Sequence, residues 1–67
     1  MNIALSITDD YEERLDEFED ATEACEWLLE QVQEVATHHE QFNAQDTYTF
    51  ADNSQITFKG NYYRVGG

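Results

Sequence analysis

The amino-acid sequence predicts a small α+β domain in which one antiparallel sheet packs on one main amphipathic helix. Three observations lead to this prediction: an alternating apolar segment at residues 2–8, apolar residues at helical spacing from Ala21 to His39, and alternating segments separated by turn residues after residue 45. A chain of 67 residues forms a single domain, residues 1–67, whose core is near the lower size limit for stability. One helix layer on one sheet is the economical arrangement.

Residues 2–8 carry apolar side chains at every second position, Ile3, Leu5 and Ile7. Strict alternation of apolar and polar residues is typical of a strand that buries one face. We therefore expect an N-terminal strand here. Thr8 and the two aspartates that follow it offer side-chain oxygens that could cap a helix beginning next.

Residues 10–19 fit more than one structure. Their aromatic and leucine side chains have the i, i+4, i+7 spacing of a helix, which would extend the main helix backwards. The segment could instead form a further helix or a strand that ends before Asp20. Asp20 and Glu23 have the three-residue offset of a capping box, so we expect a helix to start at Asp20 in either case.

The main helix is predicted from Ala21 to His39, because its apolar positions recur at i, i+3, i+4 and i+7. These positions are Ala24, Cys25, Leu28, Leu29, Val32, Val35 and Ala36. Cys25 is the only cysteine and falls on this face, so we expect a buried thiol, no internal disulfide and a reducing, cytoplasmic environment. His38 and His39 would end the helix, where protonated imidazole suits the negative end of the dipole.

The last third of the chain is predicted to form a three-stranded antiparallel meander. Residues 41–45 are a polar connector, after which Tyr48 and Phe50 alternate with polar residues. Turns are expected at residues 52–54 and 59–61, because Asp, Asn, Ser and Gly favour them. The strands between and after these turns would complete the sheet with the N-terminal strand.

Negative charge is concentrated in the first half of the chain. Twelve of the fifteen acidic residues lie between Asp9 and Glu34, where only Arg14 opposes them, and the formal net charge is −12. If this segment were one helix turning about 100° per residue, seven carboxylates would fall within roughly 60° of one line. They are Glu12, Asp16, Glu19, Glu23, Glu26, Glu30 and Glu34. Without the backward extension, the last four would still align and the earlier ones would lie beside them.

The spacing of these carboxylates indicates a function. Successive members would be roughly 4.5–6 Å apart along the helix axis, comparable with the ~3.4 Å axial spacing of phosphates on one nucleic-acid strand. Like charges at i,i+4 destabilise a helix by about 0.2–0.5 kcal/mol per pair, so folding gives no reason to align them. Burial of the apolar face, at roughly 1.5–3 kcal/mol per large side chain, is enough to offset this repulsion.

Trp27 lies among these carboxylates, about 40° from Glu23 around the helix. It either packs under a neighbouring hairpin or the C-terminal aromatic residues, or stays exposed as an aromatic anchor inside an acidic surface. We include it with the candidate partner-binding residues. The full set is Glu12, Asp16, Glu19, Asp20, Glu23, Glu26, Trp27, Glu30 and Glu34.

The sequence does not contain the common signatures of catalysis or metal binding. It has no glycine-rich phosphate loop, zinc-binding pattern or calcium loop. Cys25 would lie about 20 Å along the helix from the two histidines, too far for a nucleophile and its base. A solvated row of carboxylates also lacks the buried cleft that a general acid requires. We therefore expect no enzyme activity, no cofactor and no metal.

The charge also restricts the partner. Nucleic acids and anionic membranes are polyanions that would be repelled, so the expected partner is a basic nucleic-acid-binding protein. No run of 18 apolar residues could span a membrane, and no basic leader segment follows Met1. We expect an unprocessed, soluble, cytoplasmic monomer.

In size and in the acidic segment from Asp9 to Glu34, the chain resembles the small phage-encoded DNA-mimic proteins of the anti-CRISPR type. The resemblance is one of size and charge pattern, without a shared motif. It implies a non-enzymatic inhibitor that occupies the surface on which a Cas protein of a CRISPR surveillance complex recognises target DNA or its PAM. The host-cell cytoplasm would then be its location.

Two other functions fit the same charge. One is an interaction module adapted to high salt, but such adaptation scatters acids over every face, and residues 41–67 contain only Asp46 and Asp52. The other is an antitoxin-like partner that neutralises one basic protein. It shares the electrostatics and differs in the target.

Overall fold

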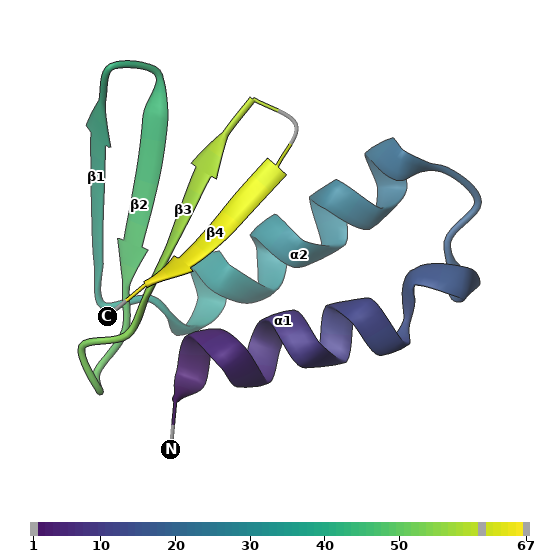
Figure 1. Ribbon diagram of the computed structural model, residues 1–67, viewed down its shortest axis with the longest axis horizontal. Helices are drawn as coiled ribbons and strands as arrows, with labels where there is room; N and C mark the ends of the chain where they lie inside the picture. Colours follow the sequence, from purple (N-terminus) through teal and green to yellow (C-terminus); the bar gives the residue numbers. More distant parts are fainter. Residues whose placement is uncertain (1, 61, 67) are drawn as a thin grey trace.

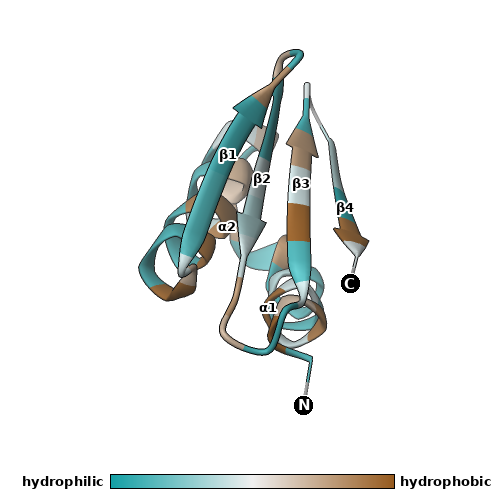
Figure 2. Cartoon of the chain, turned by 90° about the vertical axis from the view of Figure 1, so that its left-hand side faces the viewer, coloured by the Kyte–Doolittle hydropathy of each residue, from teal (hydrophilic) through white to brown (hydrophobic). Residues whose placement is uncertain are grey.

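The structure is a computed structural model that describes residues 2–60 and 62–66. Two helices and a short 3-10 turn precede four strands: α1 (Ile3–Glu13), η1 (Leu15–Glu17), α2 (Ala21–Val35), β1 (His38–Phe42), β2 (Gln45–Thr49), β3 (Gln55–Lys59) and β4 (Tyr62–Gly66). The strands form one antiparallel sheet in the order β1-β2-β3-β4. Both helices lie on the same face of this sheet (Figure 1, Figure 2). The predicted α+β class with a single antiparallel sheet is confirmed.

The predicted strand at residues 2–8 is wrong, because this segment begins helix α1. Ala4 and Thr8 are buried and Ile7 is half-buried, which is the spacing of one helical face, whereas Leu5 is 48 % exposed. The Thr8 hydroxyl donates to the carbonyl oxygen of Ala4 at 3.0 Å, so its polar group is satisfied inside the core. The segment fits a strand through Ile3, Leu5 and Ile7 and a helix through Ala4, Ile7 and Thr8, and the observed burial follows the helix.

The N-terminus of α1 is held by a turn that is distant in the sequence. Asn2 is the local N-cap. The backbone N–H of Ile3 donates to a carboxylate oxygen of Asp52 at 2.8 Å, and that of Ala4 donates to the Ser54 hydroxyl at 3.1 Å. These contacts satisfy helix N–H groups that have no partner within the helix. The turn between β2 and β3 therefore fixes where α1 begins.

This turn predicts a pH-dependent contribution to stability. Hydrogen bonds from the Ser54 side chain and the Ile3 backbone hold the pKa of Asp52 below its ordinary value. Because the folded-state pKa is depressed, the carboxylate stabilises the fold above its unfolded pKa of about 3.9, and this contribution is lost as the pH falls through the folded pKa. We expect Asp52→Asn to lower the thermal midpoint at neutral pH, with a difference from wild type that shrinks as the pH falls through the folded-state pKa of Asp52. Thermal melts over this range measure it, and a pH-independent difference would contradict it.

Helix α2 ends earlier than its apolar periodicity predicts. It stops at Val35, and Ala36 is extended with φ −62° and ψ 139°. The backbone N–H of Thr37 then donates to the carbonyl oxygen of Thr49 at 2.8 Å, and its side-chain hydroxyl donates to the same oxygen at 3.1 Å. Pairing with β2 therefore begins directly after the helix, and the two histidines expected at the helix end lie in β1 instead.

Strand β1 replaces the end of the predicted helix, which reaches His39, and the start of the predicted connector at residues 41–45. All five of its residues are exposed, so it has no alternating burial to reveal it. It forms because its backbone pairs with β2 across a tight turn in which Asn43 and Ala44 have φ of 51° and 62°. Positive φ at both central residues is typical of hairpins with a two-residue turn.

The remaining strands and the first predicted turn are confirmed. Strands β2, β3 and β4 follow the predicted meander, with the turn at 52–54 between β2 and β3. Gly60 lies in the second predicted turn with φ of 59°, and Asn61 lies outside the described residues. The sheet and both helices enclose the core, whose largest fully buried side chains are Phe50, Leu28, Ile56 and Val32.

Candidate functional site

The two layers of the fold differ strongly in charge. Residues 1–35 contain twelve acids and one arginine, a charge of −11, whereas residues 36–67 contain three acids, one lysine and one arginine, a charge of −1. Because the helices belong to the first segment and the sheet to the second, the negative charge lies on one side of the fold. The helix layer is therefore the candidate binding surface.

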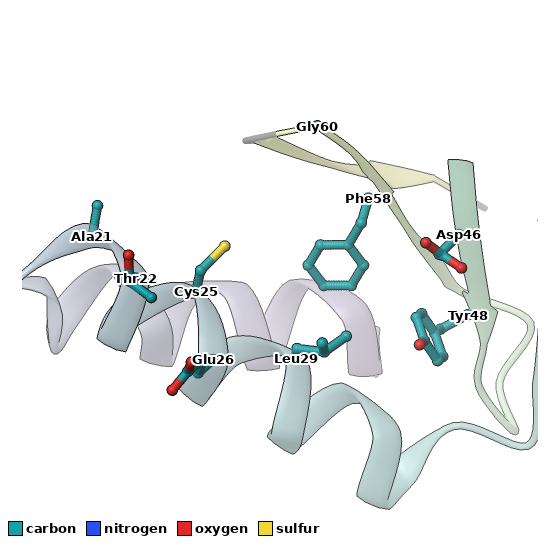
Figure 3. A pocket seen from close by; sticks show the side chains of 9 residues that line it. All are labelled: Ala21, Thr22, Cys25, Glu26, Leu29, Asp46, Tyr48, Phe58 and Gly60. Atoms are coloured by element: carbon teal, nitrogen blue, oxygen red, sulfur yellow. The ribbon is translucent and has the colours of Figure 1, made fainter. Parts of the chain in front are cut away.

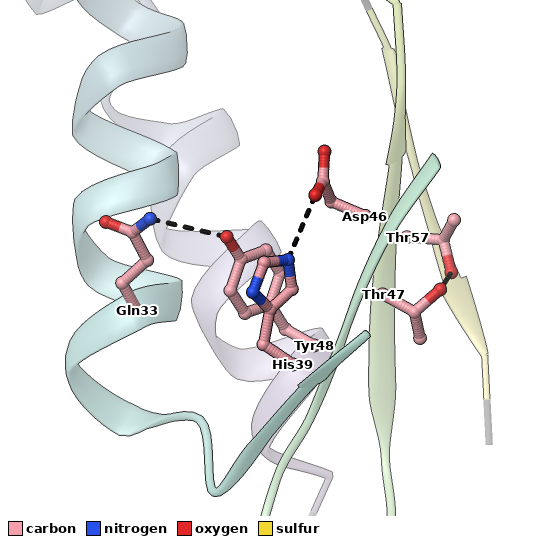
Figure 4. Close-up of polar contacts among 6 residues, drawn as sticks. All are labelled: Gln33, His39, Asp46, Thr47, Tyr48 and Thr57. Atoms are coloured by element: carbon pink, nitrogen blue, oxygen red, sulfur yellow. Dashed lines mark hydrogen bonds and ion pairs between the residues drawn. The ribbon is translucent and has the colours of Figure 1, made fainter. Parts of the chain in front are cut away.

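Lys59 and Arg64 lie on the face of the sheet opposite the helices. Side chains alternate along a strand, so Thr47 and Tyr48 point to opposite faces, with Tyr48 turned towards α2 (Figure 4). Thr47 and Thr57 are paired, as are Thr57 and Arg64, which places Arg64 on the outer face. Lys59 lines the same outer depression as Arg64. Neither cation faces the helix layer.

Arg14 is the one cation within the helix layer, and it interacts with other acids. It pairs with Asp10 at 3.3 Å and Glu17 at 3.7 Å, and its guanidinium lies 5.6 Å from the centre of the Trp27 ring. Within residues 2–60 and 62–66, the only other ion pair joins His39 and Asp46. No carboxylate of α2 is therefore paired with a cation among these residues.

Helix α2 aligns four of the predicted site residues, which we call the α2 stripe: Glu23, Glu26, Glu30 and Glu34. All four are exposed. The buried residues of α2, among them Leu28 and Val32, lie on the opposite side of the helix and fix it to the sheet. At 1.5 Å per residue the stripe is roughly 16 Å long. The prediction that these four align is confirmed.

The longer stripe of seven carboxylates on one helix is wrong, because the chain reverses between α1 and α2. Phe18 is extended, with φ −92° and ψ 144°, and interrupts helical geometry before Asp20. Asp16 lies in η1 and Glu19 in the link to α2; both are exposed. Of the alternatives for residues 10–19, a further helix is correct for residues 10–13 only, because these residues form the last turn of α1.

Glu12 faces β4 and is separate from the α2 stripe. The hydroxyl of Tyr63 on β4 donates to a carboxylate oxygen of Glu12 at 3.4 Å. Burial raises the pKa of Tyr63 above its ordinary value, and the negative charge of Glu12 raises it further. The pair joins α1 to the sheet, so Glu12 has a structural contact of its own.

Asp20 is the N-cap of α2, as predicted, but Glu23 completes the capping box with a neighbouring N–H group and not with that of Asp20. The N–H of Glu23 donates to the Asp20 side chain at 2.8 Å, and the N–H of Glu19 donates to the Glu23 carboxylate at 3.4 Å. One unpaired N–H group of the first turn of α2, that of Glu23, is satisfied by Asp20, and the N–H of Glu19 just before the helix is satisfied by Glu23. Glu23 is therefore both the first residue of the stripe and part of the helix cap.

Removing the Asp20 side chain should destabilise the domain without changing any residue of the α2 stripe. We expect Asp20→Ala to cost about 0.5–2 kcal/mol, the usual range for loss of an N-cap side chain. In a domain of this size each kcal/mol lowers the thermal midpoint by about 4–8 °C. Calorimetry or circular dichroism measures the shift. Asp20→Ser retains a capping oxygen and should leave the midpoint near that of wild type; equal losses in the two variants would contradict the capping role.

Trp27 is half-buried on the side of α2 that faces α1. Its ring stacks on Tyr11 at 6.2 Å and lies 5.9 Å from Phe18, and Tyr11 meets Tyr63 edge-on at 5.8 Å. Burial is the main cause of the raised pKa of Tyr11. This aromatic cluster joins α1, α2 and β4, so Trp27 packs within the fold at the edge of the stripe.

The predicted burial of Cys25 is wrong, because its side chain is exposed in a groove beside α2. The groove has a volume of about 610 Å³ and lies between α2 and strands β2 and β3. Figure 3 shows Cys25 and Leu29 pointing into it from the helix, with Phe58 and Tyr48 opposite. No local pattern reveals this groove, because residues of α2, β2 and β3 that are distant in the sequence form it together.

A polar network borders the groove on the sheet. The ring of His39 stacks on Tyr48, with centroids 4.3 Å apart and planes within 3°, and its Nε2 lies 2.9 Å from a carboxylate oxygen of Asp46. The amide of Gln33 on α2 donates to the Tyr48 hydroxyl at 3.3 Å (Figure 4). Asp46 and Tyr48 also line the groove. His39 thus orients an acidic side chain at the groove.

Among the described residues, no group of three or more His, Cys, Asp or Glu side chains is placed to hold a metal ion. The helices of this part of the chain are too short and too polar to cross a membrane. Comparison of the chain with protein-family models, curated proteins and solved structures found no match to any of them.

Proposed function

We propose that this protein is a non-enzymatic polyanion mimic, which binds the basic nucleic-acid-binding surface of another protein and blocks access of DNA. The observation that carries the proposal is the α2 stripe: four exposed carboxylates on one helix, none of which is paired with a cation of the described chain. A partner that normally holds phosphates presents the complementary charge.

The energetics of α2 favour this interpretation. The pairs Glu26–Glu30 and Glu30–Glu34 are both at i,i+4, and each destabilises the helix by about 0.2–0.5 kcal/mol. Burial of Leu28 and Val32, at roughly 1.5–3 kcal/mol each, offsets that repulsion. The packed helix therefore presents preorganised negative charge, which steers association with a basic surface and accelerates it by about 10- to 1,000-fold.

Within this class, we favour an anti-CRISPR role, in which the partner is a Cas protein and the occupied surface is the one that recognises target DNA or its PAM. The small size of the domain and its acidic helix layer support this assignment. A PAM-reading surface uses arginines that pair with bases and phosphates, and carboxylates pair well with arginine. The inhibition would be by occupancy, with no covalent step.

The proposal is tested by affinity capture followed by competition. Tagged protein is immobilised and incubated with a lysate that contains nucleases and other DNA-binding proteins, and bound proteins are challenged with duplex DNA. We expect captured proteins to be basic, to bind DNA themselves, and to be released by duplex DNA. A specific partner that binds the domain and duplex DNA at the same time would overturn the proposal.

The charge asymmetry argues against a general adaptation to high salt. Such an adaptation distributes acids over all faces, whereas here the helix segment carries −11 and the sheet segment −1. The halophile hypothesis also predicts that the domain unfolds at low salt. A stable fold at low ionic strength is expected for the mimic. An antitoxin-like role differs only in the target, so the captured partner distinguishes it.

A further inference from the structure

The groove beside α2 has an apolar floor that no other part of the described chain covers. Leu29 from α2 and Phe58 from β3 are half-buried on its floor, and Tyr48 from β2 forms its end (Figure 3). An apolar floor bordered by a few polar side chains is the usual composition of a binding groove. A volume of about 610 Å³ is that of a site for several apolar side chains.

The edges of the groove are acidic. Glu26 borders it on the helix and Asp46 on the sheet. Glu26 is also a member of the α2 stripe, so the apolar groove and the negative surface meet at this residue. A segment that fills the groove must therefore carry apolar side chains on one face and positive charge beside them. Charge complementarity excludes an acidic segment and favours lysine or arginine at these edges.

Resting on the proposed function, we infer that the groove receives an amphipathic basic helix of the partner protein, with its apolar face on Leu29 and Phe58 and its cations beside Glu26 and Asp46. A helix laid in an apolar groove is a common mode of peptide recognition, read through anchors at i, i+3, i+4 and i+7. The stripe then supplies electrostatic attraction, and the groove supplies apolar burial that pure charge mimicry lacks.

Cys25 provides a direct reporter for this inference. It is the only cysteine of the chain, it is exposed, and it lines the groove. Its alkylation by iodoacetamide therefore measures access to the groove in the unmodified protein. The probe is a synthetic helix of leucine and lysine with leucines at i, i+3, i+4 and i+7. Its control is a peptide of identical composition in scrambled order.

We expect the amphipathic peptide to bind about tenfold or more tightly than the scrambled one, because the latter buries no continuous apolar face. It should slow alkylation of Cys25 in proportion to its occupancy. The scrambled peptide, which carries the same charge, should not protect the thiol. Equal affinities, or binding of the amphipathic peptide without protection of Cys25, would overturn the inference.

Two variants separate this inference from the proposed function. Leu29→Gln should abolish the preference for the amphipathic peptide while leaving binding of the scrambled, purely electrostatic peptide unchanged. Glu30→Gln should weaken both peptides by the same factor. If stripe variants alone reduce binding, the groove has no role and the polyanion proposal stands. Each variant must show a native circular dichroism spectrum. Alkylation of Cys25 in the wild type before peptide is added should likewise abolish the preference for the amphipathic peptide, without any substitution.

A second copy of the chain is the competing occupant. It would protect Cys25 as the protein concentration is raised in the absence of peptide, and it would appear as a dimer in analytical ultracentrifugation. We expect a constant alkylation rate across protein concentrations. Self-protection would overturn the inference.

Discussion

Replacing Glu26 and Glu30 together with lysine should weaken binding to the basic partner by about ten- to a hundredfold, or roughly 1.4–2.7 kcal/mol. The reason is that both side chains lie in the middle of the α2 stripe, and charge reversal places cations against the cations of the partner. Isothermal titration calorimetry or biolayer interferometry with the captured partner measures the loss. The fold should persist, because both positions are exposed.

The matched control is the double substitution of Asp9 and Glu13 with lysine. Both variants change the net charge from −12 to −8. Tyr11 faces α2, and at about 100° per residue Asp9 and Glu13 lie on the opposite side of α1, away from the stripe. Asp46 and Asp52 are unsuitable controls, since one lines the groove and the other caps α1. Equal losses of affinity in the two variants would mean that binding depends on the net charge of the protein and not on the arrangement of its carboxylates.

Leu28→Ala should remove most of the stability of the domain at 25 °C and populate the unfolded state. Leu28 is 1 % exposed and packs in the core between α2 and the sheet. Truncating such a side chain costs about 2–5 kcal/mol, and a core in a domain of this size supplies only about 3–5 kcal/mol. Since α2 carries the stripe on its other side, we expect loss of the helix to abolish partner binding as well. Urea denaturation followed by circular dichroism measures the change.

Leu28→Met keeps the side-chain volume and provides the comparison for this result. A volume-conserving exchange usually costs less than about 1.5 kcal/mol. That variant should retain a cooperative transition and bind the partner with wild-type affinity. A Leu28→Ala protein with a near-native denaturation midpoint would show that α2 is held in place by something other than this core.

The elements whose residues give one unambiguous local signal could be predicted from the sequence. Asp20 and Glu23 marked the start of α2, and the periodic apolar residues marked its buried face. Tyr48, Phe50, Ile56 and Phe58 alternate with polar residues and gave β2 and β3. The α2 stripe followed directly from that helix, because three- and four-residue spacing places its carboxylates together.

The elements that depend on distant contacts could not be predicted. The N-terminal segment fits a strand through Ile3, Leu5 and Ile7 and a helix through Ala4, Ile7 and Thr8, and caps from Asp52 and Ser54 complete the helix about fifty positions away. Strand β1 has five exposed residues and forms through backbone pairing alone.

The same limit applies to the site. The predicted alignment of seven carboxylates on one helix required residues 14–20 to be helical, and the extended backbone at Phe18 prevents this. The position of Cys25 on the apolar side of the helix indicated burial, yet its thiol is exposed in the groove between α2 and the sheet. Residues of α2, β2 and β3 that are distant in the sequence form the groove together, and the sequence carries no local signal for it.

The dependence of partner affinity on salt tests the central claim most directly. If the α2 stripe replaces phosphates on a basic surface, the logarithm of the binding constant should fall linearly as the logarithm of salt concentration rises, as it does for DNA binding to the same surface. The slope should become shallower when Glu26 and Glu30 are neutralised to glutamine and stay unchanged when Asp9 and Glu13 are neutralised to asparagine and glutamine. An affinity that is indifferent to salt, or equal slopes for both variants, would contradict the account.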